Sequence, residues 1–294
     1  MAATTTPPTG AGEAEPTGVG KARPTGAGST TPPPRPGVAP IRPRPKGPLV
    51  VRFYRSAVGK KWVMAVTGVI LILFVVGHLI GNLKLFLSKE EINLYGEALR
   101  NVPGALLPRT VLLWMVRILL IFAFVFHIHS AAGLTIMNRK ARPAGDHYQS
   151  KRDYVAADYA SRTMRFTGVF VLLFLIFHLM DLTWGNANSQ FLRGDPYNNL
   201  VYSLQRPAAA IIYALGATAL AIHLYHGTWS MFQSLGITNP RYNSLRRRLA
   251  QGLALFMLVG NLSFPIAVQL HAVTLQCPHT QPTTAVCKSG SVSK

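Results

Sequence analysis

The chain has 294 residues, of which 49% are hydrophobic, and its formal net charge is +20 at pH 7. A positive mean hydropathy of +0.24, together with long uncharged runs, excludes an ordinary soluble globule. A basic excess of this size can indicate nucleic-acid binding, but the positions of the basic residues, described below, argue against a nucleic-acid partner.

The chain begins with a stretch, residues 1–48, in which Pro, Thr, Gly and Ala dominate and PTG recurs at 8–10, 16–18 and 24–26. Such a composition cannot bury enough apolar surface to order itself. The stretch also lacks the apolar core of a signal peptide. We therefore expect residues 1–48 to be a disordered cytoplasmic tail.

Five segments that follow are apolar and long enough to cross a membrane, which takes about 20 residues. They span about 62–83, 111–137, 166–184, 207–232 and 249–271. The only charged side chains inside them are Arg117, in the second, and Asp181, in the third. We therefore predict an all-α membrane protein, with five transmembrane helices in residues 49–275 and an external tail at 276–294.

The basic residues are distributed unevenly between the two sides of the membrane. With the N-terminus inside, 21 of the 30 Lys and Arg residues precede the first span or lie in 139–165 and 241–248, and 8 lie in the outer segments. This is the positive-inside bias of membrane proteins. It predicts a cytoplasmic N-terminus and an external C-terminus, and it accounts for the net charge without nucleic acid.

The first and third spans repeat one another. Residues 67–79 read TGVILILFVVGHL and residues 167–179 read TGVFVLLFLIFHL, so His78 and His178 follow their TG at the same distance. The second and fourth spans share the pattern I-H-x-x-x-G. A two-span unit duplicated in one direction gives a pseudo-twofold axis along the membrane normal, with the fifth span outside the duplication.

Six of the nine histidines lie within the spans, on four different helices. They are His78, His127, His129, His178, His223 and His226. Ionisable residues inside a bilayer are costly and indicate function. Depth divides them into an outer layer, from spans one and three, and an inner layer, from spans two and four. Two layers of imidazoles predict two bis-histidine b haems in a four-helix bundle, with His78 and His178 holding the outer haem.

The inner pair requires a choice, because His127 and His129 are two residues apart and face nearly opposite ways around a helix. In IHSAAG and IHLYHG, a glycine follows the first histidine by one turn and removes side-chain bulk where a porphyrin must lie. We predict that these glycines mark His129 and His223 as the inner ligands. His127 and His226 then pack beside them.

Three arginines are candidate partners of the haem propionates. Arg117 lies about seven residues into the second span from its outer side, where an unpaired charge is costly. Arg162 and Arg165 open the third span on the inner side. The alternatives are snorkelling of Arg117 to the interface and ordinary cytoplasmic anchoring by Arg162 and Arg165.

The two cysteines, Cys277 and Cys287, both follow the fifth span on the predicted outer side. Disulfides persist there, so the pair either closes a short loop or stays as two thiols. The sequence CPHT at 277–280 is not a CxxCH motif, so covalent haem attachment is not indicated.

Several motifs in these spans carry a family resemblance. They are GHLIGN at 77–82, HSAAG at 129–133, RFTGVF and FHLMDL within 165–182, and HLYHGTWSMFQSLGIT at 223–238. Over about residues 50–272, the chain resembles the di-haem cytochrome b (b558-type) membrane anchor of bacterial succinate:menaquinone oxidoreductases. The resemblance implies a plasma-membrane subunit that binds a flavoprotein and an iron–sulfur subunit on the cytoplasmic face. Such complexes can form higher oligomers.

The resemblance also implies a place in the respiratory chain and the tricarboxylic acid cycle. Electrons from succinate would pass through iron–sulfur clusters and two b haems to quinone, while the succinate and flavin sites would lie in a partner chain. The implied axial ligands are His78, His129, His178 and His223. Some fumarate reductases of the family carry Glu two residues before the fourth-helix ligand, where this chain has Ala221, so fumarate reduction is disfavoured.

A quinone site implied by the resemblance would need a pocket at membrane level with a proton donor. Candidates at the outer end are Asp181, Trp184 and Lys84, and candidates at the inner end are Tyr54, Ser56 and Trp62. The sequence does not rank the two ends.

Two other functions fit parts of the pattern. A cytochrome b subunit of another membrane dehydrogenase, such as a hydrogenase or formate dehydrogenase, would place histidines in the same way. A haem-free, histidine-dependent transporter would more typically add intramembrane carboxylates or group histidines with Asp, Glu or Cys at one depth. Because only Asp181 lies near a span, the two layers favour stacked haems.

Overall fold

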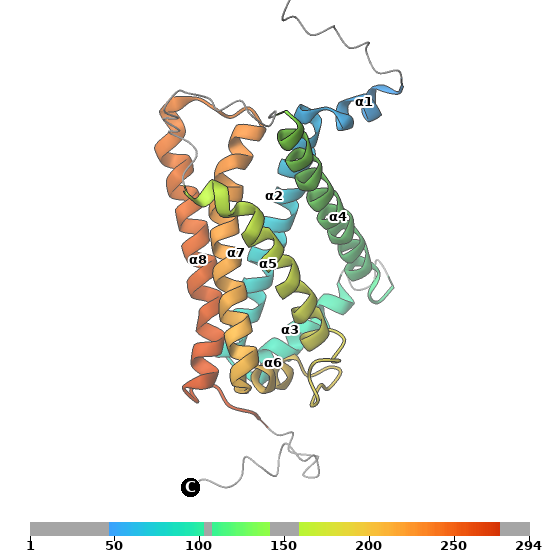
Figure 1. Cartoon of the computed structure of the whole chain (residues 1–294). Helices are drawn as coiled ribbons and strands as arrows, with labels where there is room; N and C mark the ends of the chain where they lie inside the picture. Colours follow the sequence, from blue (N-terminus) through green and yellow to red (C-terminus); the bar gives the residue numbers. More distant parts are fainter. Residues whose placement is uncertain (1–46, 103–107, 142–158, 277–294) are drawn as a thin grey trace, which may run out of the picture. The chain divides into compact units, whose positions relative to one another are not determined.

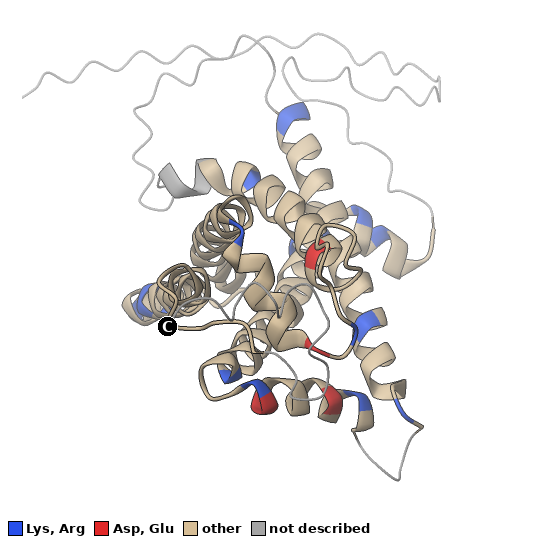
Figure 2. Ribbon diagram, turned by 90° about the horizontal axis from the view of Figure 1, so that it is seen from below, with Lys and Arg blue, Asp and Glu red and all other residues tan. Residues whose placement is uncertain are grey.

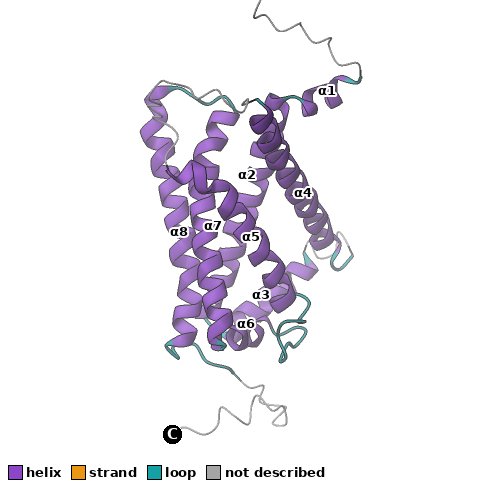
Figure 3. Cartoon of the chain, viewed as in Figure 1, coloured by secondary structure: helices purple, strands orange, loops and turns teal. Residues whose placement is uncertain are grey.

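The computed structural model describes residues 47–102, 108–141 and 159–276, with side chains in the last range described from Thr163. Every regular element in these ranges is helical (Figure 3). The elements are α1 (Leu49–Arg55), α2 (Ala57–Asn82), η1 (Leu83–Phe86), α3 (Lys89–Asn101), α4 (Val111–Lys140), α5 (Tyr159–Leu182), α6 (Pro196–Gln205), α7 (Pro207–Ser234), η3 (Pro240–Tyr242) and α8 (Asn243–Gln269). Nearly all of both predicted tails, including Cys277 and Cys287, lies outside the described residues.

Five helical segments are long and apolar enough to cross a membrane, which confirms the predicted all-helical fold with five candidate spans. The segments are Ala57–Phe86, Val111–Lys140, Thr163–Leu182, Pro207–Ser234 and Pro240–Gln269. The first begins earlier than predicted because the Ser56 hydroxyl accepts the Gly59 N–H at 2.9 Å and so caps α2. The chain is a multi-pass membrane protein.

Helix α7 is the most widely packed of the spans. It lies against α2, α5 and α8, and α2 also packs against α4 (Figure 1). Apolar side chains such as Leu73, Ile121 and Leu215 are exposed on the spans, as expected of surfaces that face lipid. The main buried core lies near the end that α3 and α6 cover. It contains Leu79, Leu85, Ile92, Tyr197, Leu200, Val201, Leu204, Leu224, Met257, Phe264 and Val268.

Helices α3 and α6 are joined through Asp195, which begins α6. Its carboxylate accepts the Asn198 N–H at 3.2 Å, and Pro196 takes the first helical position. From α3, the Asn93 amide lies 3.1 Å and the Lys89 ammonium 3.4 Å from this carboxylate. Burial raises the pKa of Asp195, but these hydrogen bonds and the Lys89 charge outweigh it and hold the pKa below its ordinary value.

Acidic side chains in the described part lie at one end of the bundle, whereas basic side chains occur at both ends. All five acidic residues in these ranges belong to elements at the α3–α6 end, which faces the viewer in Figure 2: Glu90, Glu91, Glu97, Asp181 and Asp195. Helix α1, the end of α4 and the start of α8 carry basic residues: Arg52, Arg55, Arg139, Lys140, Arg246, Arg247 and Arg248. The cytoplasmic position of the α1 end stays a prediction from the positive-inside rule.

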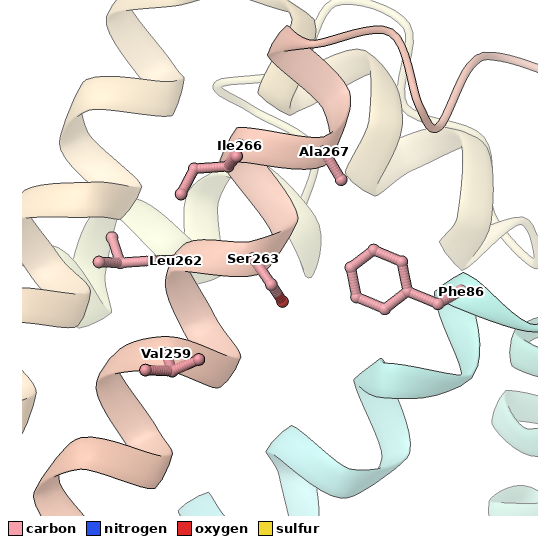
Figure 4. Close-up of a pocket in the computed structure, with 6 residues that line it drawn as sticks. All are labelled: Phe86, Val259, Leu262, Ser263, Ile266 and Ala267. Carbon is pink, nitrogen blue, oxygen red and sulfur yellow. The ribbon is translucent and has the colours of Figure 1, made fainter.

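An apolar groove lies between η1 and α8 (Figure 4). It is lined by Phe86, Val259, Leu262, Ser263, Ile266 and Ala267. The Ser263 hydroxyl donates to the Gly260 carbonyl at 2.7 Å, and no lining side chain is ionisable. The groove therefore offers no chemistry of its own, and the ionisable groups within the spans lie elsewhere.

Candidate functional site

The outer layer contains His78 from α2 and His178 from α5. Their ring centroids lie 5.9 Å apart, and the ring planes are inclined at 87°. Phe74 stacks on the His78 ring at 5.5 Å, and Phe174 lies beside the His178 ring at 5.8 Å. The two phenylalanines hold matching places in the two repeats, so the duplicated sequence builds this layer from both sides.

In the inner layer, His127 of α4 lies opposite His223 of α7. Their ring centroids are 6.3 Å apart, and the planes are inclined at 66°. Each ring contacts the TG that begins one of the two repeats: Nδ1 of His127 is 3.4 Å from Thr67 Oγ1, and Nδ1 of His223 is 3.4 Å from Thr167 Oγ1. The glycine after each threonine also lies against the ring, since a Cβ there would be in van der Waals contact with it, at 3.5 Å and 3.4 Å.

The threonine hydroxyls determine which imidazole nitrogen is free. Thr67 and Thr167 donate their protons to carbonyls of their own helices, at 2.7 Å and 3.0 Å. Each hydroxyl oxygen can therefore accept an imidazole Nδ1–H, which leaves Nε2 of His127 and of His223 with its lone pair. A neutral imidazole held through Nδ1 is the form in which histidine binds a metal ion.

Both pairs have the spacing of two imidazoles on one iron. A metal ion lies about 2 Å from an imidazole nitrogen, so imidazoles on its opposite sides have ring centroids roughly 6 Å apart. The separations are 5.9 Å and 6.3 Å. Across the described ranges, no group of three or more His, Cys, Asp or Glu side chains could hold a metal ion.

His129, the predicted α4 ligand, has a different neighbour. Its ring stacks on Tyr54 of α1, with centroids 5.7 Å apart, and its Nδ1 is hydrogen-bonded to the Tyr54 hydroxyl. Two residues turn a helix by about 200°, so His129 and His127 cannot face the same neighbour. Gly133, which favoured His129, makes room for Lys60 instead, since a Cβ there would lie 3.0 Å from the Lys60 side chain. The structure thus differs from the sequence prediction in the α4 histidine that it places opposite His223.

The predicted propionate partners belong to two helices, α4 and α5. Arg117 is exposed and stacks on Trp114 of its own helix, with its guanidinium carbon 5.0 Å from the ring centroid. Arg165 is exposed near the start of α5, and Arg162 lies in the same helix, ahead of the described side chains. Contact between these arginines and a haem stays a prediction.

The outer quinone-site candidates have protein partners of their own. Asp181 is fully buried and paired with Arg206, and Lys84 pairs with Glu91 at 2.8 Å. Trp184 is exposed. Two of the three are therefore engaged in ion pairs with other residues.

Two of the three inner quinone-site candidates also have protein partners, and the third is exposed. Tyr54 bonds to His129, Ser56 caps α2, and Trp62 is exposed. The described contacts favour neither end of the protein, so the quinone site stays a prediction.

Thr67, Thr167 and Tyr213, whose hydroxyls lie beside histidine rings, were not predicted from the sequence. The two threonines begin both copies of the repeat, so this shared TG could have indicated them. The Tyr213 hydroxyl lies 3.4 Å from His178 Nδ1. No sequence signal marks Tyr213, because the contact arises only from the packing of α7 against α5.

Comparison with known families gives one match. Residues 138–262 match the model of the succinate dehydrogenase/fumarate reductase transmembrane subunit. The matched stretch contains α5, α6, α7 and most of α8, and with them His178 and His223. No curated protein and no solved structure matches the chain. Over residues 138–262, less than half of its length, the chain is thus similar to the transmembrane subunits of succinate dehydrogenase and fumarate reductase.

Proposed function

We propose that the chain is the di-haem cytochrome b anchor of a succinate:menaquinone oxidoreductase. The observation that carries the proposal is the pair of facing imidazoles at each of two depths, with ring separations of 5.9 Å and 6.3 Å. The family match supplies the succinate dehydrogenase/fumarate reductase context. When bound, the haems supply one-electron transfer between an iron–sulfur partner and quinone.

The residues of this chain hold and orient the cofactors. His78 and His178 are the proposed outer ligands, and His223 is one inner ligand. For the second inner ligand, the contacts support His127, because it faces His223 and its Nδ1 is engaged by Thr67. The glycine pattern supports His129 instead, and haem content decides between the two.

The α1 end of the protein is the proposed docking face for the partner subunits. The family implies association with a flavoprotein and an iron–sulfur subunit. The basic residues at this end, through the positive-inside rule, support a cytoplasmic position for it. The inner histidine layer would then be nearer to the iron–sulfur clusters, and the outer layer further along the same path.

Haem content tests the proposal. The complex is purified from membranes with its partner subunits, and b haem is quantified from the reduced-minus-oxidised spectrum. Two haems per chain are expected, and the absence of b-type absorbance would refute the haem proposal. His78→Ala is expected to lose the outer haem and retain the inner one, whereas loss of both would argue against the pairing.

A matched pair of variants identifies the α4 ligand. His127→Ala should reduce the haem content from two to one, and His129→Ala should leave it at two. The reverse result would establish the glycine-based choice. Co-purification of a flavoprotein and an iron–sulfur subunit, with succinate-dependent quinone reduction, distinguishes this function from a hydrogenase or formate dehydrogenase cytochrome.

A further inference from the structure

A buried carboxylate lies beside the outer histidine layer. Asp181 of α5 has no exposed surface, and three side chains converge on it. Tyr213 donates its hydroxyl proton to Oδ2 at 2.9 Å, Ser203 also donates to Oδ2, and Arg206 forms an ion pair through Oδ1. The arginine supplies the counter-charge that a fully buried carboxylate needs in order to stay ionised.

The same tyrosine hydroxyl reaches the outer histidine. Its oxygen lies 3.4 Å from Nδ1 of His178. Because the hydroxyl proton is directed to Asp181, the oxygen can accept the imidazole Nδ1–H. The three groups therefore form a chain, from the His178 imidazole through the Tyr213 hydroxyl to the Asp181 carboxylate.

Among the described residues, no such chain reaches the other three paired histidines. In the first repeat, Gly81 stands where the second repeat has Asp181, and the Asn82 amide lies 3.2 Å from His78 Nε2. In the inner layer, His127 and His223 contact threonine hydroxyls whose protons go to neutral carbonyls. Among the paired histidines, the described contacts thus connect a carboxylate to His178 alone.

We propose that Tyr213 is a positioning residue that lowers the midpoint potential of the outer haem through His178. A carboxylate behind the imidazole draws the Nδ1 proton away and makes the ligand a stronger electron donor. A stronger donor stabilises the ferric iron, so the haem is harder to reduce. The inference rests on the proposed function, because it requires His178 to be an axial ligand.

The test is a potentiometric titration of the b-type absorbance in the purified complex. The component of the titration curve that is missing in His78→Ala is first assigned to the outer haem. Tyr213→Phe keeps the ring among Phe174 and Phe177 and removes only the hydroxyl. The outer midpoint potential should shift upward, and the inner potential should not change. Tyr202→Phe is the matched control, because the Arg206 guanidinium also lies over the Tyr202 ring, but the described contacts do not join Tyr202 to His178.

A second variant tests the carboxylate itself. Asp181→Asn keeps the shape of the side chain and removes its charge, so it should shift the outer potential in the same direction as Tyr213→Phe. An unchanged or lowered outer potential in Tyr213→Phe, or equal shifts of both haems, would overturn the inference while leaving the di-haem function intact. Failure of the wild-type complex to show two b haems would overturn the proposed function and, with it, this inference.

Discussion

Removal of Arg206 should destabilise the outer end of the protein strongly. In the described part, Arg206 is the basic side chain that forms an ion pair with Asp181, which has no exposed surface. Removing one partner of a buried ion pair costs about 3–5 kcal/mol, because the other charge stays buried without compensation. The Arg206 side chain is 33% exposed, so water can partly replace it. We therefore expect Arg206→Gln to lower the free energy of unfolding by about 3 kcal/mol, the lower end of that range.

The assay is denaturant or thermal unfolding of the purified complex, arranged as a double-mutant cycle. Arg206→Gln is compared with Asp181→Asn and with the double variant, which removes both charges. The double variant should be more stable than Arg206→Gln alone, because no uncompensated charge remains. Arg193→Gln, an exposed arginine in the same outer segment, should change stability by no more than about 0.5 kcal/mol. A double variant no more stable than Arg206→Gln would refute the reasoning.

Three further predictions follow from other contacts. Gly216→Ala places a Cβ 2.3 Å from the Phe174 ring beside the outer histidine layer, so the outer haem should be lost while the inner one remains, measured by haem content. Thr167→Val removes the hydroxyl that holds Nδ1 of His223 and should broaden or shift the low-spin EPR signal of the inner haem only. Because the folded pKa of Asp195 is lowered, its stabilisation of the α3–α6 junction is present above an unfolded carboxyl pKa of about 3.9 and is lost as pH falls below it. The protection factor of the amides at the start of α6, which is the exchange rate of the unfolded chain relative to the observed rate, should thus fall as the pH drops below about 4 in the wild type, and Asp195→Asn should remove this dependence.

The sequence was informative where a physical cost restricts the choice of residue. Charged groups are costly in a bilayer, so the uncharged runs predicted five spans, which the structure confirms. The repeated TG and histidine placed His78 and His178 at one depth, and their rings lie 5.9 Å apart. Depth follows from counting residues along a helix, because every residue adds the same rise.

The sequence predicted the depth of a histidine in the membrane more readily than the direction in which it points around its helix. In a helix of a soluble protein, the polar residues mark the face toward water, so the opposite face is known to be buried. A membrane helix is apolar all round and has no such mark. Nothing in α4 therefore shows which of His127 and His129 faces the bundle. The glycine pattern favoured His129 as the ligand, whereas in the structure His127 faces His223 and His129 contacts Tyr54. Long-range contacts such as Tyr213 with His178 depend on how α7 meets α5, which no local pattern in either helix encodes.

Helix α7 carries both Tyr213, at the outer layer, and His223, at the inner layer. His223 follows Tyr213 by ten residues, which rise about 15 Å, and the backbone hydrogen bonds of a helix do not allow that length to stretch. The rate of electron tunnelling falls steeply with the separation of two redox centres. Under the proposed function, the number of residues in this stretch would therefore set the tunnelling distance. An inserted residue would add about 1.5 Å and turn His223 by roughly 100°, away from its partner, so this part of the chain should not tolerate a change of length.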